Sequence, residues 1–167
     1  MLKPLTHFFP PALSWAIVAM VAQTMASGNE PSAQWSQWRG PHRTGHIAPS
    51  QPWPASIQEG TLQEAWRIEL GPSYSSPIVT EEHVFVTETV DKKYEVIRAL
   101  NRKTGEQAWE LRWEGALKVP FFAQSNGSWI RATPVYDNGR LYVAGIRDVI
   151  SCIDASNGKE VWRVDFV

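Results

Sequence analysis

Several features that would assign a protein to a class are scarce in this sequence. Only one cysteine, Cys152, occurs in 167 residues, so no intrachain disulfide can form and an exported form must rely on core packing. Charges nearly balance, with 16 Lys and Arg against 17 Asp and Glu, so the basic face that nucleic-acid binding uses is missing. Serine or cysteine nucleophile motifs and phosphate-binding loops are also absent. We therefore expect no nucleic-acid partner.

Long apolar runs are scarce as well. The apolar stretch 13–21 is shorter than the ~20 residues of a membrane-spanning helix. Lys3 and His7 precede it and small residues at 24–26 follow it, which is typical of a cleaved secretory signal peptide. We expect a signal peptide at 1–26, a periplasmic or secreted location, and a mature protein that is not integral to a membrane. An uncleaved anchor is the alternative.

A repeated pattern dominates the second half of the chain. Residues 99–109 read ALNRKTGEQAW and residues 152–162 read CIDASNGKEVW, 53 positions later. Upstream, 76–79 aligns with 133–136 at an offset of 57, and we place the four-residue difference in a hairpin loop at 91–93, where length costs little. A period in this range indicates a propeller, solenoid or array.

Each copy of the repeat has the composition of a tight turn. Asn101 and Asp154 have short side chains that can accept hydrogen bonds from backbone N–H groups two residues on. Gly105 and Gly158 can adopt the positive φ that such a turn requires. Both copies are therefore predicted to join two strands through the same turn.

One repeat unit contains four short runs that read as strands, at 77–79, 83–88, 95–100 and 107–113. Val, Ile, Phe, Tyr and Thr dominate these runs, and turn residues bound them. The connections are short, which favours antiparallel pairing. The prediction is an all-β chain of four-stranded antiparallel sheets.

A tryptophan closes each copy. Trp109 and Trp162 occupy the same position of the repeat, and Trp66, 43 residues before Trp109, is interpreted as that position one unit earlier. An aromatic side chain of this size can bury ~150–250 Å². We expect these tryptophans to pack between neighbouring units.

This pattern resembles the repeat of the pyrroloquinoline-quinone-like (PQQ-like) β-propellers, Ala-x-Asp-x-x-Thr-Gly-x-x-x-Trp. That superfamily includes quinoprotein alcohol dehydrogenases and the scaffold lipoprotein of the outer-membrane barrel-assembly machinery. Here Asn101 replaces the Asp of the first copy, while Cys152 and Asn157 replace Ala and Thr of the second. The resemblance covers roughly 62–166 and implies propeller blades, about two of them plus flanking strands.

The resemblance also suggests how the chain is divided. Residues 35–45 resemble the opening of secreted propeller proteins of planctomycete-like bacteria, so we expect an N-terminal strap at 27–61 and a partial propeller at 62–167. A ring needs ~4–8 blades. The chain is therefore expected to be part of a larger propeller or to complete a ring with copies of itself.

An enzyme reading finds little support in these residues. Quinoprotein dehydrogenases of this superfamily hold PQQ and Ca²⁺ with Glu and Asn ligands, a catalytic Asp and, in many, two adjacent cysteines. The single Cys152 excludes that pair, and no position here matches the ligands or the base. His42 and His46 have a zinc-like spacing, but Pro41 and Gly45 oppose the helix it needs. We assign no catalytic, cofactor or metal residue.

The best candidate for binding is the long connection 114–131. Long loops on a rigid scaffold often carry function, and aromatic residues with arginine suit protein or sugar recognition. The residues in question are Trp113, Phe121, Phe122, Trp129 and Arg131. The alternative is that the two phenylalanines pin the loop to the blades.

Three functions remain open at this point. The leading hypothesis is a non-catalytic exported propeller module that acts as a protein-binding or scaffold domain, with carbohydrate as a second choice of partner. The first alternative is the N-terminal part of a PQQ-dependent quinoprotein oxidoreductase, with PQQ and calcium as cofactors. The second is an extracellular carbohydrate-binding or sensor domain.

Overall fold

The computed structural model describes residues 34–47, 54–115, 121–122 and 127–166, which all belong to one compact unit, Ser32–Val167. The predicted signal peptide and the start of the predicted strap lie outside these residues. In the described ranges, no helix is long and apolar enough to cross a membrane.

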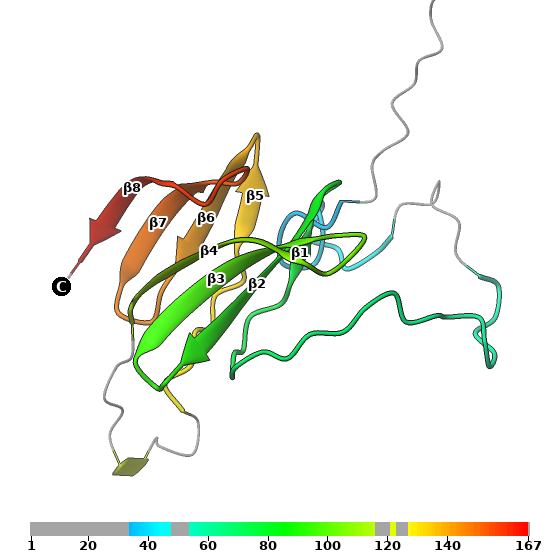
Figure 1. Cartoon of the computed structure of the whole chain (residues 1–167), viewed down its shortest axis with the longest axis horizontal. Helices are drawn as coiled ribbons and strands as arrows, with labels where there is room; N and C mark the ends of the chain where they lie inside the picture. The colour runs from blue at the N-terminus through cyan, green and yellow to red at the C-terminus, as the bar shows by residue number, and fades with distance from the viewer. Residues whose placement is uncertain (1–33, 48–53, 116–120, 123–126, 167) are drawn as a thin grey trace, which may run out of the picture. The chain divides into compact units, whose positions relative to one another are not determined.

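The described residues form two antiparallel four-stranded sheets, and the fold is all-β (Figure 1). We call β1–β4 blade 1 and β5–β8 blade 2, because within each sheet the strands pair in chain order. The strands are β1 (Ile78–Val79), β2 (His83–Val90), β3 (Tyr94–Asn101), β4 (Gln107–Glu114), β5 (Val135–Asp137), β6 (Arg140–Ala144), β7 (Val149–Asp154) and β8 (Glu160–Asp165).

The length difference between the units lies where the repeat predicts it. In blade 1 the strands β2 and β3 extend to Val90 and Tyr94, and Asp91 and Lys92 make the turn with φ of 54° and 52°. In blade 2 the corresponding strand β6 already ends at Ala144. The extra four residues therefore lengthen one hairpin and leave the pairing of the other strands unchanged.

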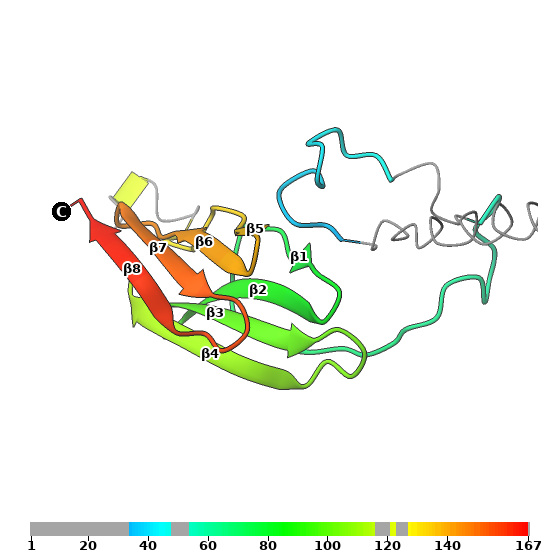
Figure 2. The same cartoon turned by 90° about the horizontal axis from the view of Figure 1, so that it is seen from above.

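The two blades pack face to face, with strands of one lying against strands of the other (Figure 2). The hydrophobic core between them includes Ile97 and Trp109 from blade 1 and Leu141, Val143 and Ile153 from blade 2. On β2, both alternating faces are buried from Phe85 to Thr89. β2 is thus covered on both faces, whereas on β4 only Trp109 and Trp113 are buried and the residues of the other face are exposed.

Trp66 lies in a segment that forms no ladder within the described residues, although the repeat predicts a strand there. A fourth strand needs the third strand of its own sheet beside it, and no such strand occurs in the described part of the chain. The segment instead continues past blade 1, where the Thr89 N–H donates to the Pro72 carbonyl.

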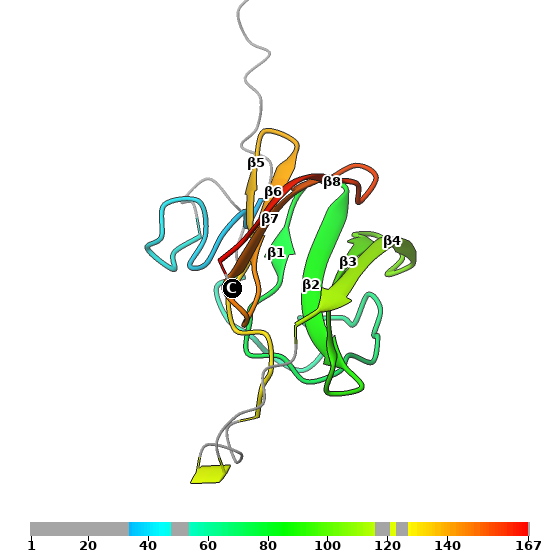
Figure 3. The same cartoon turned by 90° about the vertical axis from the view of Figure 1, so that its left-hand side faces the viewer.

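The strap is attached to the first strand of each blade (Figure 3). Trp35 and Val79 exchange two backbone hydrogen bonds of 2.7 and 2.8 Å, and the Tyr136 N–H donates to the Ser36 carbonyl at 2.8 Å. Gly40, with φ of 80°, lies against the Trp35 ring so closely that a Cβ there would be 2.8 Å from it. Residues 35–40 therefore pack on both blades, while the predicted limits of the strap, 27–61, stay a prediction.

Candidate functional site

The two repeat turns have the geometry predicted for them. Asn101 Oδ1 accepts hydrogen bonds from the N–H groups of Lys103 (2.9 Å) and Thr104 (3.1 Å), and Gly105 has φ of 75°. In blade 2, Asp154 Oδ1 accepts from the Ser156 N–H at 3.0 Å. The Asp154 pKa is held below its ordinary value by the hydrogen bonds from Ser156 and, less strongly, by Arg140.

Each turn is a socket for a tryptophan of the preceding unit. The Trp109 indole N–H donates to the Ala155 carbonyl at 3.0 Å, and its ring covers Gly158, where a Cβ would be 2.6 Å away. Trp66 makes the same contacts one unit earlier, with the Arg102 carbonyl (2.9 Å) and Gly105. The glycines are therefore needed for two reasons, the positive φ and the space under the ring.

Trp162, the third tryptophan of the series, has no such socket among the described residues. Its ring is 44% exposed and lies 6.2 Å from the Tyr142 ring, centroid to centroid. Ile150, Val164 and Phe166 on the same face of blade 2 are also exposed. The equivalent face of blade 1 is the one that packs against blade 2.

Cys152, which stands where the repeat pattern has Ala, lies on β7 and is buried. In the described part of the chain, no three His, Cys, Asp or Glu side chains lie close enough together to hold a metal ion.

The residues predicted for the partner-binding loop differ in their surroundings. Phe121 and Phe122 are 85% and 75% exposed and contact each other edge to face. Arg131 is exposed and lies 4.9 Å above the Tyr74 ring, while Trp129 is half-buried. Parts of this connection, 116–120 and 123–126, lie outside the described residues.

The phenylalanine pair does not pin the loop to the blades, because both rings are exposed to solvent. Trp113 was also grouped with this loop, but it lies in the fourth strand, as the predicted run 107–113 has it. Trp113 belongs to β4 and is 7% exposed, because its face of blade 1 is the one covered by blade 2. It is therefore part of the contact between the blades.

A buried carboxylate joins the two blades at this point. Glu95, fully buried on β3, accepts hydrogen bonds from the Trp113 indole N–H (2.7 Å) and the Ile146 backbone N–H (2.8 Å). Burial raises the Glu95 pKa, and the two hydrogen bonds with the charge of Arg163 oppose that rise. Gly115 and Gly145 give this carboxylate room, because a Cβ on either would overlap it.

A second charged group lies on the opposite face of blade 1. Glu88 on β2 is buried, forms an ion pair with Arg98 on β3 at 2.5 Å, and accepts a hydrogen bond from the Gly71 N–H. Arg98 also lies 3.4 Å from Glu110 on β4. Neither the Glu95 bridge nor the Glu88–Arg98 ion pair was predicted from the sequence. A signal for the ion pair was available, because Glu88 and Arg98 lie on neighbouring strands of the predicted sheet.

Comparison with protein families agrees with the repeat. A family model described as outer membrane protein assembly factor BamB matches residues 56–127 and again 93–167. Similar curated proteins are uncharacterized proteins of Rickettsia conorii, 31% identical over 120 residues, and Rickettsia prowazekii, 29% identical over 117 residues. The matches cover 66% of this chain and 27% of each relative.

One solved structure supports the fold. A europium-containing methanol dehydrogenase superposes with a TM-score of 0.56 and 18% identity, covering 83% of this chain and 24% of that one. A quinohemoprotein alcohol dehydrogenase from Comamonas testosteroni gives a TM-score of 0.42 and 20% identity over 57% of this chain and 13% of that one. With the two family matches together covering 56–167, the chain belongs to the PQQ-like β-propeller repeat family.

Proposed function

We propose that this protein is a non-catalytic, exported propeller module that binds another protein and acts as a scaffold. The observation that carries the proposal is the Phe121–Phe122 pair, two large aromatic rings that contact each other and are both exposed. Aromatic side chains are enriched at the centres of protein interfaces because they bury much area at low entropic cost. The matched family model is described as an assembly factor for outer membrane proteins, which favours a protein partner in the cell envelope.

Site-specific photo-crosslinking tests this proposal. A photoreactive phenylalanine analogue is placed at position 121 of the protein expressed in its native cell, and adducts are identified by mass spectrometry. We expect one discrete protein adduct, which disappears when Phe122→Ala is added. The same analogue at Leu62, which is 63% exposed but lies in a different segment, is the control. Equal labelling from both positions, or none from position 121, would count against the proposal.

A second candidate function is part of a quinoprotein dehydrogenase, favoured by the likeness of fold to the europium-containing methanol dehydrogenase. Since identity is 18%, that likeness supports the fold and leaves the chemistry open. The fully buried Glu95 is already used by two N–H donors of the blade contact, and in the described ranges no three His, Cys, Asp or Glu side chains are placed to hold a metal ion. Oxidation of alcohols by the purified protein with added PQQ and Ca²⁺ or a lanthanide would favour this reading over the scaffold.

A further inference from the structure

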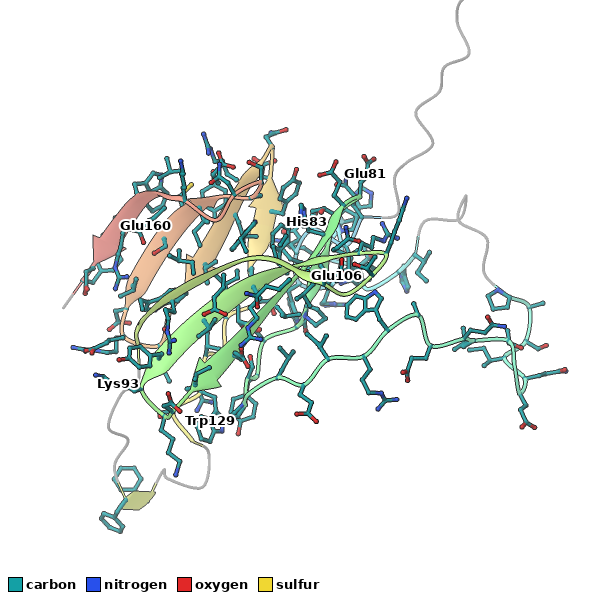
Figure 4. All side chains as sticks on the ribbon, viewed as in Figure 1. Glu81, His83, Lys93, Glu106, Trp129 and Glu160 are labelled. Carbon is teal, nitrogen blue, oxygen red and sulfur yellow. The ribbon has the colours of Figure 1, made fainter. Side chains whose placement is uncertain are left out.

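A cleft of about 510 Å³ lies between the blades at the end that carries the repeat turns. One wall is the β1–β2 turn, residues 80–83, and the other is formed by the β5–β6 and β7–β8 turns, 138–140 and 154–156. Tyr136 lines the cleft between the two walls and is half-buried, and its ring stacks at 6.3 Å on the Phe85 ring, which is fully buried. Figure 4 shows Glu81 and His83 at this end, far from Trp129 and Lys93 at the other.

The first wall is held in one conformation by its own hydrogen bonds. The Thr80 N–H donates to the His83 carbonyl at 2.9 Å, and the His83 N–H donates back to Thr80 Oγ1 at 3.1 Å. Arg102 donates to the carbonyls of Glu82 (2.8 Å) and Thr80 (3.0 Å). Fixed groups lose little freedom when they bind a ligand, so this turn is a pre-organised wall.

The second wall is equally fixed but carries no free charge. Arg140 donates to Asp154 at 2.8 Å, so their charges compensate. The Ala155 N–H donates to the Gly139 carbonyl at 3.0 Å, which ties the two turns of this wall together. A ligand therefore meets a neutral polar pair on this side.

The charge in the cleft comes from the first wall. Glu81 and Glu82 are exposed, and neither forms an ion pair within the described ranges. His83 and Tyr136 are half-buried and line the same cleft as the two glutamates, so a ligand in the cleft meets both carboxylates and aromatic rings. A planar guanidinium group both pairs with carboxylates and stacks on aromatic faces, and an ammonium group does so less well.

We infer that this cleft binds an arginine side chain of a partner protein. The inference rests on the proposed protein-binding function, but it concerns a surface other than the Phe121–Phe122 pair. The cleft has the volume for one long side chain with its flanking backbone, and charge complementarity with Glu81 and Glu82 selects a cation. The aromatic lining selects arginine over lysine.

Titration of the purified protein with short peptides tests the inference. The probes are acetylated and amidated Gly-Arg-Gly, the same peptide with lysine, and the same peptide with uncharged citrulline, followed by NMR chemical shifts or calorimetry. We expect the arginine peptide to bind more tightly than the lysine peptide, with citrulline at least ~10-fold weaker. Added salt weakens the arginine peptide, because exposed charges are screened.

Two matched double variants locate the site. Glu81→Gln with Glu82→Gln is expected to weaken the arginine peptide at least ~10-fold. Glu59→Gln with Glu69→Gln removes the same charge from exposed positions outside the cleft and is expected to leave binding unchanged. Since all four residues are exposed, the variants keep the fold, and circular dichroism checks this.

Three results would overturn the inference. They are equal binding of the arginine and citrulline peptides, no binding at ~10 mM peptide to the folded protein, and an oligosaccharide that competes for the same shifted resonances. Failure of the proposed function is seen separately, as loss of the position-121 crosslink. If the crosslink is absent but the arginine peptide still binds, the cleft site is supported and the proposed function is not.

Discussion

Blade 1 and blade 2 carry large apolar residues at equivalent places of one face, but in different surroundings. Ile97 and Trp109 of blade 1 are 0% and 9% exposed, whereas Ile150 and Trp162, 53 positions later, are 38% and 44% exposed. The same offset relates Trp113, 7% exposed, to Phe166, 66% exposed. One repeat therefore encodes a face that is complete only when another unit covers it.

The difference shows where the stability of a blade originates. Hydrogen bonds within each sheet are similar, since both blades have four antiparallel strands and a bulge at the same place, between Ala99 and Leu100 and between Cys152 and Ile153. What blade 1 gains from blade 2 is the socket at Gly158, the core contacts and the Glu95 bridge. The two blades therefore differ more in the contacts that cover this face than in the hydrogen bonding of their sheets.

The largest expected effect comes from truncating the two tryptophans. Trp109→Ala removes a buried ring and its hydrogen bond to Ala155 and is expected to lower the free energy of unfolding by ~3–5 kcal/mol. Trp162→Ala removes an exposed ring and is expected to cost less than ~1 kcal/mol. Chemical denaturation of both variants measures this, and equal costs would mean that Trp162 is covered in solution.

The glycine beneath Trp109 gives the next effect. Gly158→Ala forces a Cβ to within 2.6 Å of the ring and strains a residue with φ of 73°, so we expect a loss of roughly 2–4 kcal/mol. Gly139→Ala is the matched control, because its φ is 79° but nothing lies within 4 Å of the added atom. Its expected cost is the backbone strain alone, ~1–2 kcal/mol. Identical melting temperatures for the two variants would show that the close packing of the Trp109 ring on Gly158 does not contribute to stability.

The residues changed in these two experiments belong to the part of the structure that could be predicted from the sequence. The repeat predicted the turns at Asn101 and Asp154, the role of Trp66 and the place of the length difference, because each depends on local chemistry repeated at a fixed offset. Trp113 was assigned to its strand, 107–113, but was also grouped with the binding loop, because its burial depends on the neighbouring blade. Glu95 was missed for a similar reason, since its partner Ile146 is 51 residues away and no repeat-equivalent carboxylate bridge occurs in blade 2 among the described residues.

The Glu95 bridge gives an effect that depends on pH. Glu95→Gln keeps one hydrogen-bond acceptor, the amide oxygen, but places the amide NH₂ group against an N–H donor. We therefore expect the free energy of unfolding to fall by ~1–3 kcal/mol. Because burial raises the Glu95 pKa in the folded state, the folded protein holds this proton more tightly than the unfolded chain. The Glu95 contribution to stability is therefore greatest at low pH and falls as the pH rises from the ordinary glutamate pKa to the raised one.

Denaturation of the wild type and Glu95→Gln across that pH range measures the difference. We expect the advantage of the wild type to shrink as the pH rises. An advantage that grows with pH would show that the Glu95 pKa is lowered in the folded protein.

The smallest expected effect is a difference between the two repeat turns in their stability at acid pH. The lowered Asp154 pKa means that its stabilisation of the blade 2 turn is present above the ordinary aspartate pKa and is lost as the pH falls through the lowered one. Asn101 does not titrate. Amide hydrogen exchange should therefore show opening at Ser156 in acid beyond the intrinsic change, with no counterpart at Lys103 and Thr104 of blade 1. Parallel behaviour of the two turns would contradict this.

Hydroxyl-radical footprinting of Trp109 and Trp162 in the 167-residue chain tests the central claim most directly. We expect rapid oxidation of Trp162, which is 44% exposed, and protection of Trp109, which is 9% exposed in its socket. Equal oxidation rates would contradict the unequal covering of the two blades.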